Sequence, residues 1–125
     1  MSQELWRWSA TDLARAIASG KVSSREAVQS TLDRIAAVNP ALNAIVQVLA
    51  DEALAAADVA DAAVRAGYRP GPLHGVPVTT KVNVDQRGCA TTNGVAEFRN
   101  VIAADDSLVV ANLRKAGAII IGRTN

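Results

Sequence analysis

The apolar run AIII at residues 118–121 limits the possible folds of this chain more than any other stretch. A strand with one wet face alternates apolar and polar residues, whereas a strand covered on both faces does not. The valine-rich run at residues 76–84 predicts an earlier strand, and a helical pattern lies between the two. A strand, a connection containing a helix and a second strand form a crossover unit, so we expect the two strands to be parallel.

Short helices are predicted near the start of the chain. Ser9 and Thr11 are both good cap residues for a helix over residues 12–19, and Gly20 supplies the stop. The sequence SSRE at residues 23–26 has the spacing of a capping box and begins a second helix. We expect this helix to end at Asn39-Pro40, because the residue before a proline is disfavoured in helical geometry.

The middle of the chain is punctuated by glycine and proline. A short β-prone run at residues 44–49 precedes an alanine-rich helix over residues 51–66. Residues 67–77 contain three glycines and three prolines, which predicts a loop. Residues 85–104 show no clear period, and a connection of this length is usually functional or contains a short element of its own.

The fold class that these elements predict is α/β. Asp106 is expected to cap the helix before the AIII run, with Val109 and Val110 facing inward. The expected architecture is a set of N-terminal helices plus the first strands of a mixed, mostly parallel sheet with helices on its faces. Residues 1–125 are assigned to one domain, with a helical region at about 9–66, a loop at 67–77 and a strand-loop-helix-strand unit at 76–122.

Charge and cysteine content exclude several classes of protein. Thirteen basic and twelve acidic residues give a net charge of +1 without a basic cluster, which argues against direct binding to nucleic acid or an anionic membrane. Cys89 is the single cysteine, so no internal disulfide can form. The first ten residues lack the apolar region typical of a signal peptide, and no apolar run reaches the roughly 18 residues that a membrane span needs. We expect a cytoplasmic protein with a small-molecule partner.

Lys81 is the residue that points most directly to chemistry. A lysine in a strand most often faces solvent, but the flanking valines and threonines offer little polar surface, and the Gly/Pro-rich loop before it is typical of a small cleft. Burial lowers the pKa of a lysine, and the neutral amine can then accept a proton. Both alternatives remain open from the residues alone.

Other candidate residues have simpler structural explanations. They are His74, Cys89, Asp105, Asp106, Trp6 and Trp8. The histidine and the cysteine lack catalytic partners at useful spacing, the aspartates fit a helix cap, and the tryptophans fit an anchor for the N-terminal arm. No phosphate loop, dinucleotide fingerprint or metal-ligand spacing is present, so no cofactor and no metal is expected.

Three blocks of the sequence together resemble the amino-terminal part of the amidase signature family. They are GPLHGVPVTTKVNVD at 71–85, TTNG at 91–94 and DSLVVANLRKAGAIIIGRTN at 106–125, and residues 9–46 are similar to that family's usual opening. The resemblance implies a hydrolase of carboxylic amides that uses a serine, a second serine beside a cis peptide bond, and a lysine.

The family's lysine lies in a Gly-x-Pro-x-x-x-Lys block, which corresponds here to Gly75, Pro77 and Lys81. Lys81 is therefore implied to be catalytic. Both serines of the family follow a block that corresponds here to residues 122–125, so they are expected beyond residue 125, and Ser107 is not a candidate.

The sequence departs from the family at two positions. Val82 and Val95 stand where many members have aspartate and serine, which leaves the choice of substrate open.

The resemblance implies an amidase that acts on a small-molecule amide, present here as an amino-terminal fragment that is inactive alone. One alternative is the amidase-type subunit of a tRNA-dependent amidotransferase, which releases ammonia from glutamine. Another is a non-catalytic assembly module completed by a second chain. The terminal strand, residues 118–125, is expected to leave an edge uncovered, which makes self-association through it a further expectation.

Overall fold

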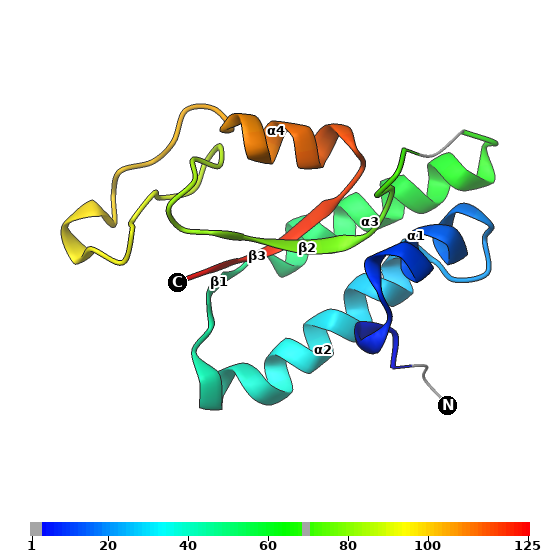
Figure 1. The fold of residues 1–125 in the computed structure, drawn as a ribbon, viewed down its shortest axis with the longest axis horizontal. Coiled ribbons are helices and arrows are strands. Elements are labelled where there is room, and N and C mark those ends of the chain that lie inside the picture. Colours follow the sequence, from blue (N-terminus) through cyan, green and yellow to red (C-terminus); the bar gives the residue numbers. More distant parts are fainter. Residues whose placement is uncertain (1–3, 69–70) are drawn as a thin grey trace.

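The computed structural model describes residues 4–68 and 71–125, and within them a three-stranded sheet has helices on both faces (Figure 1). Arg69 and Pro70, which belong to the predicted loop, lie outside the described residues. The elements in chain order are η1 (Leu5–Arg7), α1 (Ala10–Ala18), α2 (Ser24–Leu42), β1 (Ile45–Val48), α3 (Ala50–Arg65), β2 (Pro77–Lys81), η2 (Ala96–Phe98), α4 (Leu108–Lys115) and β3 (Ile119–Thr124). The predicted α/β class is confirmed.

The last strand of the chain lies in the middle of the sheet. The strand order is β1-β3-β2, with β3 parallel to β2 and antiparallel to β1. The predicted parallel crossover from β2 through α4 to β3 is therefore confirmed. The expectation that the terminal strand exposes an edge is wrong, because both of its sides form ladders within the chain. The edges without a partner in the described residues belong to β1 and β2.

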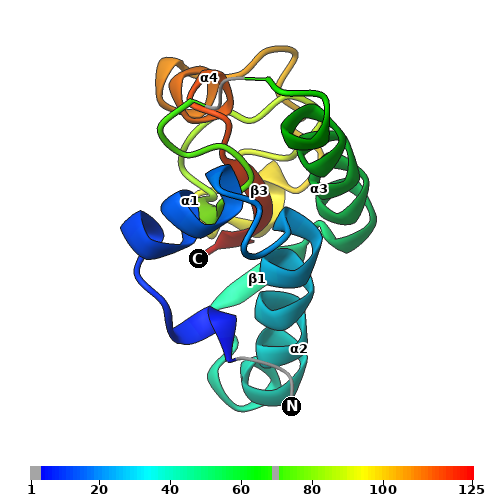
Figure 2. The same ribbon diagram turned by 90° about the vertical axis from the view of Figure 1, so that its right-hand side faces the viewer.

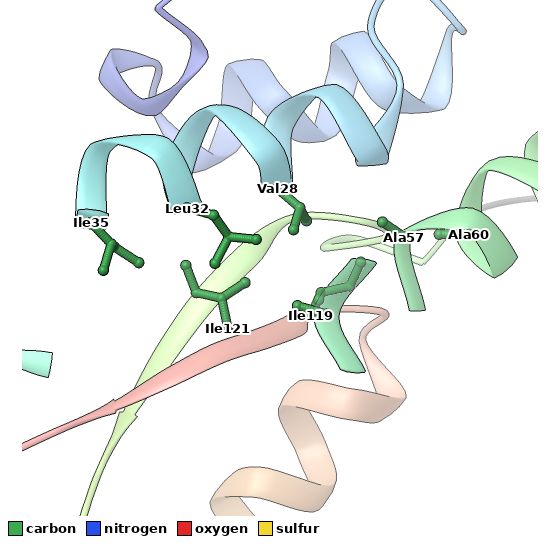
Figure 3. Close-up of a cluster of buried hydrophobic side chains, with 8 residues drawn as sticks. Val28, Leu32, Ile35, Ala57, Ala60, Ile119 and Ile121 are labelled. Carbon is green, nitrogen blue, oxygen red and sulfur yellow. The ribbon is translucent and has the colours of Figure 1, made fainter. Parts of the chain in front are cut away.

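The AIII run is buried on both faces of the sheet, as its composition predicts. Helices α2 and α3 lie side by side on one face of the sheet, and the side chains of Ile119 and Ile121 point from β3 toward them and pack against both (Figures 2 and 3). Ile120 points to the opposite face and packs against Val110 of α4 and Cys89. Alternate residues of one strand thus serve two cores, and this leaves no position for a polar side chain within the run.

Side-chain caps begin the first two helices, and α1 starts at Ala10, two residues before its predicted start. The Ser9 hydroxyl accepts from the Asp12 N–H at 3.1 Å and begins α1. At α2, Ser23 accepts from the Glu26 N–H while the Glu26 carboxylate accepts from the Ser23 N–H, so both bonds of the capping box are present. Asp61 of α3 adds a second cap, since its carboxylate accepts from the first two backbone N–H groups of α2.

The expected end of α2 at Asn39-Pro40 is wrong, because the helix continues to Leu42 with Pro40 inside it. The Asn39 side chain donates to the Ile45 carbonyl at 2.8 Å and accepts from the Ile45 N–H at 3.0 Å, which ties the last turn to β1. Asn43 then ends the helix in the left-handed conformation. These contacts offset the backbone hydrogen bond that a proline cannot make.

Strand β2 is shorter than the predicted run 76–84. It ends at Lys81, and the Val84 N–H donates to the Lys81 carbonyl at 3.2 Å, which closes a turn. The aperiodic segment 85–104 contains the short helix η2 and an isolated bridge between Ala90 and Ile102, so it does hold hidden structure.

The cap of α4 is Ser107 and not Asp106. The Ser107 hydroxyl accepts from the Val110 N–H at 3.4 Å. The Asp106 carboxylate instead accepts from the Arg87 N–H and pairs with Arg114 at 2.9 Å, so it links the preceding loop to the end of the helix. Val109, expected to face inward, is 58% exposed, whereas Val110 is fully buried.

Among the described residues, every helix is too short or too polar to cross a membrane.

Candidate functional site

Lys81 lies where the two parallel strands end. It is the last residue of β2 and pairs with Thr124 of β3, so the carboxyl ends of both strands meet beside it. In open α/β sheets this edge is the usual place for a ligand. The Lys81 side chain is exposed, which is the first of the two alternatives that the sequence left open, and it is free to reach a bound molecule.

The turn after Lys81 is held from two directions. The Val82 N–H donates to the Thr124 carbonyl at 2.9 Å, and the Val82 carbonyl accepts from the Asn93 N–H at 3.2 Å. The segment TTNG at 91–94 therefore lies against the end of β2, although the sequence separates them. Figure 1 shows the loop 85–104 and the C terminus at the same end of the sheet.

Arg123 lies fully buried at the centre of this end of the sheet. Its guanidinium donates to the carbonyl oxygens of Ala90 at 2.6 Å, Val84 at 2.6 Å and Lys81 at 3.3 Å. The sequence marks this residue only as part of the GRTN block. A cation that follows an apolar strand run after a single glycine is the signal that could have singled it out.

Each serine hydroxyl in the described residues has a structural partner. The hydroxyls of Ser9, Ser23 and Ser107 cap helices. Ser24 donates to the Gly75 carbonyl at 2.7 Å, Ser19 donates to the Ala16 carbonyl, and Ser30 accepts from the Trp6 N–H. None of these six is left as an evident nucleophile.

The contacts of His74 and Cys89 agree with the structural roles predicted for them. The His74 Nε2 donates to the Ala60 carbonyl at 2.9 Å, which fixes the loop before β2 to α3. Cys89 is buried among apolar side chains on the α4 face of the sheet. Within residues 4–68 and 71–125, no group of three or more histidine, cysteine, aspartate or glutamate side chains is arranged to hold a metal ion.

The two tryptophans anchor the N-terminal arm, as predicted. Trp8 packs on the cluster that joins α1 to the start of α2. The guanidinium groups of Arg7 and Arg34 both lie over the Trp6 ring, at 4.5 Å and 4.3 Å from its centroid. A hollow beside Trp6 is lined by residues of η1, α2 and the loop before α2, and no residue of β2 or β3 lines it.

Comparison with known proteins gives a consistent assignment. The family model described as Amidase matches residues 26–125. The chain is 53% identical over 121 residues to an indoleacetamide hydrolase of Bradyrhizobium diazoefficiens, covering 97% of this chain and 23% of the relative. It is 45% identical over 122 residues to a glutamyl-tRNA(Gln) amidotransferase subunit of Acidothermus cellulolyticus, covering 98% and 24%.

Solved structures agree with these sequence relatives. The peptide amidase of Stenotrophomonas maltophilia superposes with a TM-score of 0.85 at 35% identity, covering 95% of this chain and 25% of that one. The chain thus spans about a quarter of the length of the proteins it matches.

Proposed function

The chain belongs to the amidase family, and we propose that, within a complete catalytic unit, its Lys81 is the proton acceptor in hydrolysis of a carboxylic amide. The observation that carries the proposal is the position of Lys81 at the carboxyl end of β2, directly beside the end of β3. There an exposed amine can reach a molecule bound at the edge of the sheet.

The proposed mechanism needs two serines from outside these 125 residues. Once the rest of a catalytic unit covers its side chain, the Lys81 amine in its neutral form accepts the proton of a bridging serine, which accepts the proton of the nucleophilic serine as its oxygen attacks the amide carbon. The C–N bond then breaks, the amine leaves with a proton, and water releases the acid from the acyl-enzyme. The structural partners of the six described serine hydroxyls support an external source for both serines. The chain alone is therefore proposed to be inactive.

The proposed substrate is the amide of a small carboxylic acid, the class to which indoleacetamide belongs. Its support is the 53% identity to an indoleacetamide hydrolase. The 45% identity to an amidotransferase subunit favours glutamine as a second candidate, with ammonia passed to a partner protein.

A chimera tests this proposal. Residues 4–125 replace the matching segment of the Bradyrhizobium hydrolase, and ammonia release is measured with indoleacetamide and with glutamine. Loss of a general base should lower kcat roughly 100- to 10,000-fold in Lys81→Ala. Lys115→Ala is the matched control, because that exposed lysine lies on α4, and it should change kcat by less than about twofold.

Each alternative has its own outcome. Faster release from glutamine than from indoleacetamide would favour the amidotransferase role. A chimera that folds but releases no ammonia from either amide would favour the assembly module. Turnover that survives in Lys81→Ala would refute the assignment of the lysine, and turnover by the 125-residue chain alone would refute the external serines.

A further inference from the structure

Arg123 is a buried charge without an acidic partner. Its side chain is fully buried, and within the described residues no carboxylate forms an ion pair with it. Its Nε is the one buried side-chain nitrogen or oxygen atom in that part of the chain that lacks a hydrogen-bond partner. Burial of a charge on these terms is costly, and an apolar residue often gives a more stable fold.

The carbonyl groups that Arg123 binds identify what its guanidinium does. They belong to Lys81 at the end of β2, to Val84 at the end of the turn, and to Ala90 in the following loop. One rigid planar group therefore connects three consecutive parts of the backbone around the lysine. Since the fork of donors is fixed, the three carbonyls are fixed relative to one another.

Other hydrogen bonds also hold this region. The Val82 N–H donates to the Thr124 carbonyl, the Val84 N–H to the Lys81 carbonyl and the Asn93 N–H to the Val82 carbonyl. Among the described residues, however, Arg123 alone donates to the carbonyls of Val84 and Ala90. Without the guanidinium, the carbonyls of Val84 and Ala90 would lose their contacts at 2.6 Å. The direction in which the Lys81 side chain leaves the sheet depends on this backbone.

We propose that Arg123 is a positioning residue that holds the turn 81–84 and the loop at Ala90 so that Lys81 keeps one fixed placement at the edge of the sheet. The inference rests on the proposed function of Lys81 for its catalytic consequence. Its structural part is independent of that function and can be tested without any enzyme activity.

The first test follows amide hydrogen exchange by NMR in the 125-residue chain. In Arg123→Met, exchange at Val84 and Asn93 should accelerate about tenfold or more relative to Val28 of α2, because the local opening no longer breaks hydrogen bonds to a charged group. Ile121→Val is the matched control. It weakens packing on the same strand without touching these carbonyls, so it should change the three amides in parallel.

The second test measures kcat and KM in the chimera. A positioning role predicts that Arg123→Met lowers kcat about tenfold or more while KM changes by less than about threefold. Arg123→Lys keeps the charge and three donors, so it should recover part of the lost kcat. A purely structural role would leave kcat of the folded fraction unchanged.

The outcomes separate this inference from the proposed function. Equal acceleration at all three amides, or kcat of Arg123→Met within about twofold of the parent, would overturn the positioning role. If Arg123→Met does not fold, Arg123→Lys must show selective acceleration at Val84 or the inference is wrong. A parent chimera without activity, combined with selective exchange, would count against the function of Lys81 and in favour of the placement by Arg123.

Discussion

Gly117→Ala should be among the most destabilising single-methyl changes in this chain. Gly117 joins α4 to β3 with φ of +94°, and a Cβ there would lie 2.6 Å from the His74 Cα and 3.0 Å from the His74 N. The neighbouring backbone is not free to retreat, because the Gly75 N–H donates to the Gly117 carbonyl at 2.9 Å. The connections that lead into β2 and β3 therefore touch at this glycine.

The expected cost has two parts. A side chain in the left-handed region costs about 1–2 kcal/mol, and overpacking against fixed backbone adds about 1–3 kcal/mol. The sum of about 2–5 kcal/mol is a large share of the roughly 5–15 kcal/mol that stabilises an ordinary domain. Gly67 offers a matched control, since its φ is +82° but a Cβ there would meet no atom of the described residues within 4 Å. Gly67→Ala should therefore cost only the first part.

Urea unfolding of both variants, followed by circular dichroism, measures the difference in the free energy of unfolding. Gly117→Ala should lose about 1–3 kcal/mol more than Gly67→Ala. Equal losses would refute the close approach of Gly117 to His74, and with it the packing of the two connections described above.

Two further predictions concern single side chains. Asp61→Asn should lower the free energy of unfolding by about 1 kcal/mol, because the Asp61 carboxylate caps the N–H groups of Ser24 and Arg25. In the same urea titration the control Asp58→Asn, which loses only an exposed ion pair with Arg25, should cost about 0–1 kcal/mol. A larger loss in Asp58→Asn than in Asp61→Asn would contradict the capping role. The Cys89 thiol is buried, so a thiol reagent should modify it only as fast as the chain opens; instantaneous labelling of the folded protein would contradict its packing under α4.

Local signals made most of the helices predictable. The capping box at Ser23 and the serine before α1 act through bonds between residues three apart, so their geometry is readable from spacing. Pro40 misled the prediction for the opposite reason. The contacts that let α2 continue are made by the Asn39 side chain to β1, which lies outside the helix.

The sequence did not show which of two neighbouring side chains caps α4. Asp106 and Ser107 are adjacent, and either side chain suits a helix cap. The choice depends on Arg87 and Arg114, which engage the aspartate and leave the serine to cap α4. A tertiary contact therefore decided a local feature.

The site itself was only partly predictable. The predicted strand 76–84 placed Lys81 in its interior, whereas β2 ends at that residue. The exposure of Lys81 was not predictable either, because it depends on what covers the edge of the sheet. The order of strands also needed the structure. A continuous apolar run predicts burial of both faces but says nothing about the number of partners along each edge.

The central position of β3 also bears on how this chain folds. Ile45 of β1 and Lys81 of β2 both pair with residues of β3, and the core under α2 and α3 includes Ile119 and Ile121. During synthesis, β1 and β2 therefore have no strand partner until β3 has left the ribosome. Such long-range pairing is slow, and unpaired strands are prone to aggregate. The three-stranded sheet therefore assembles only once β3 is available, and chaperones that shield β1 and β2 would have most effect before then.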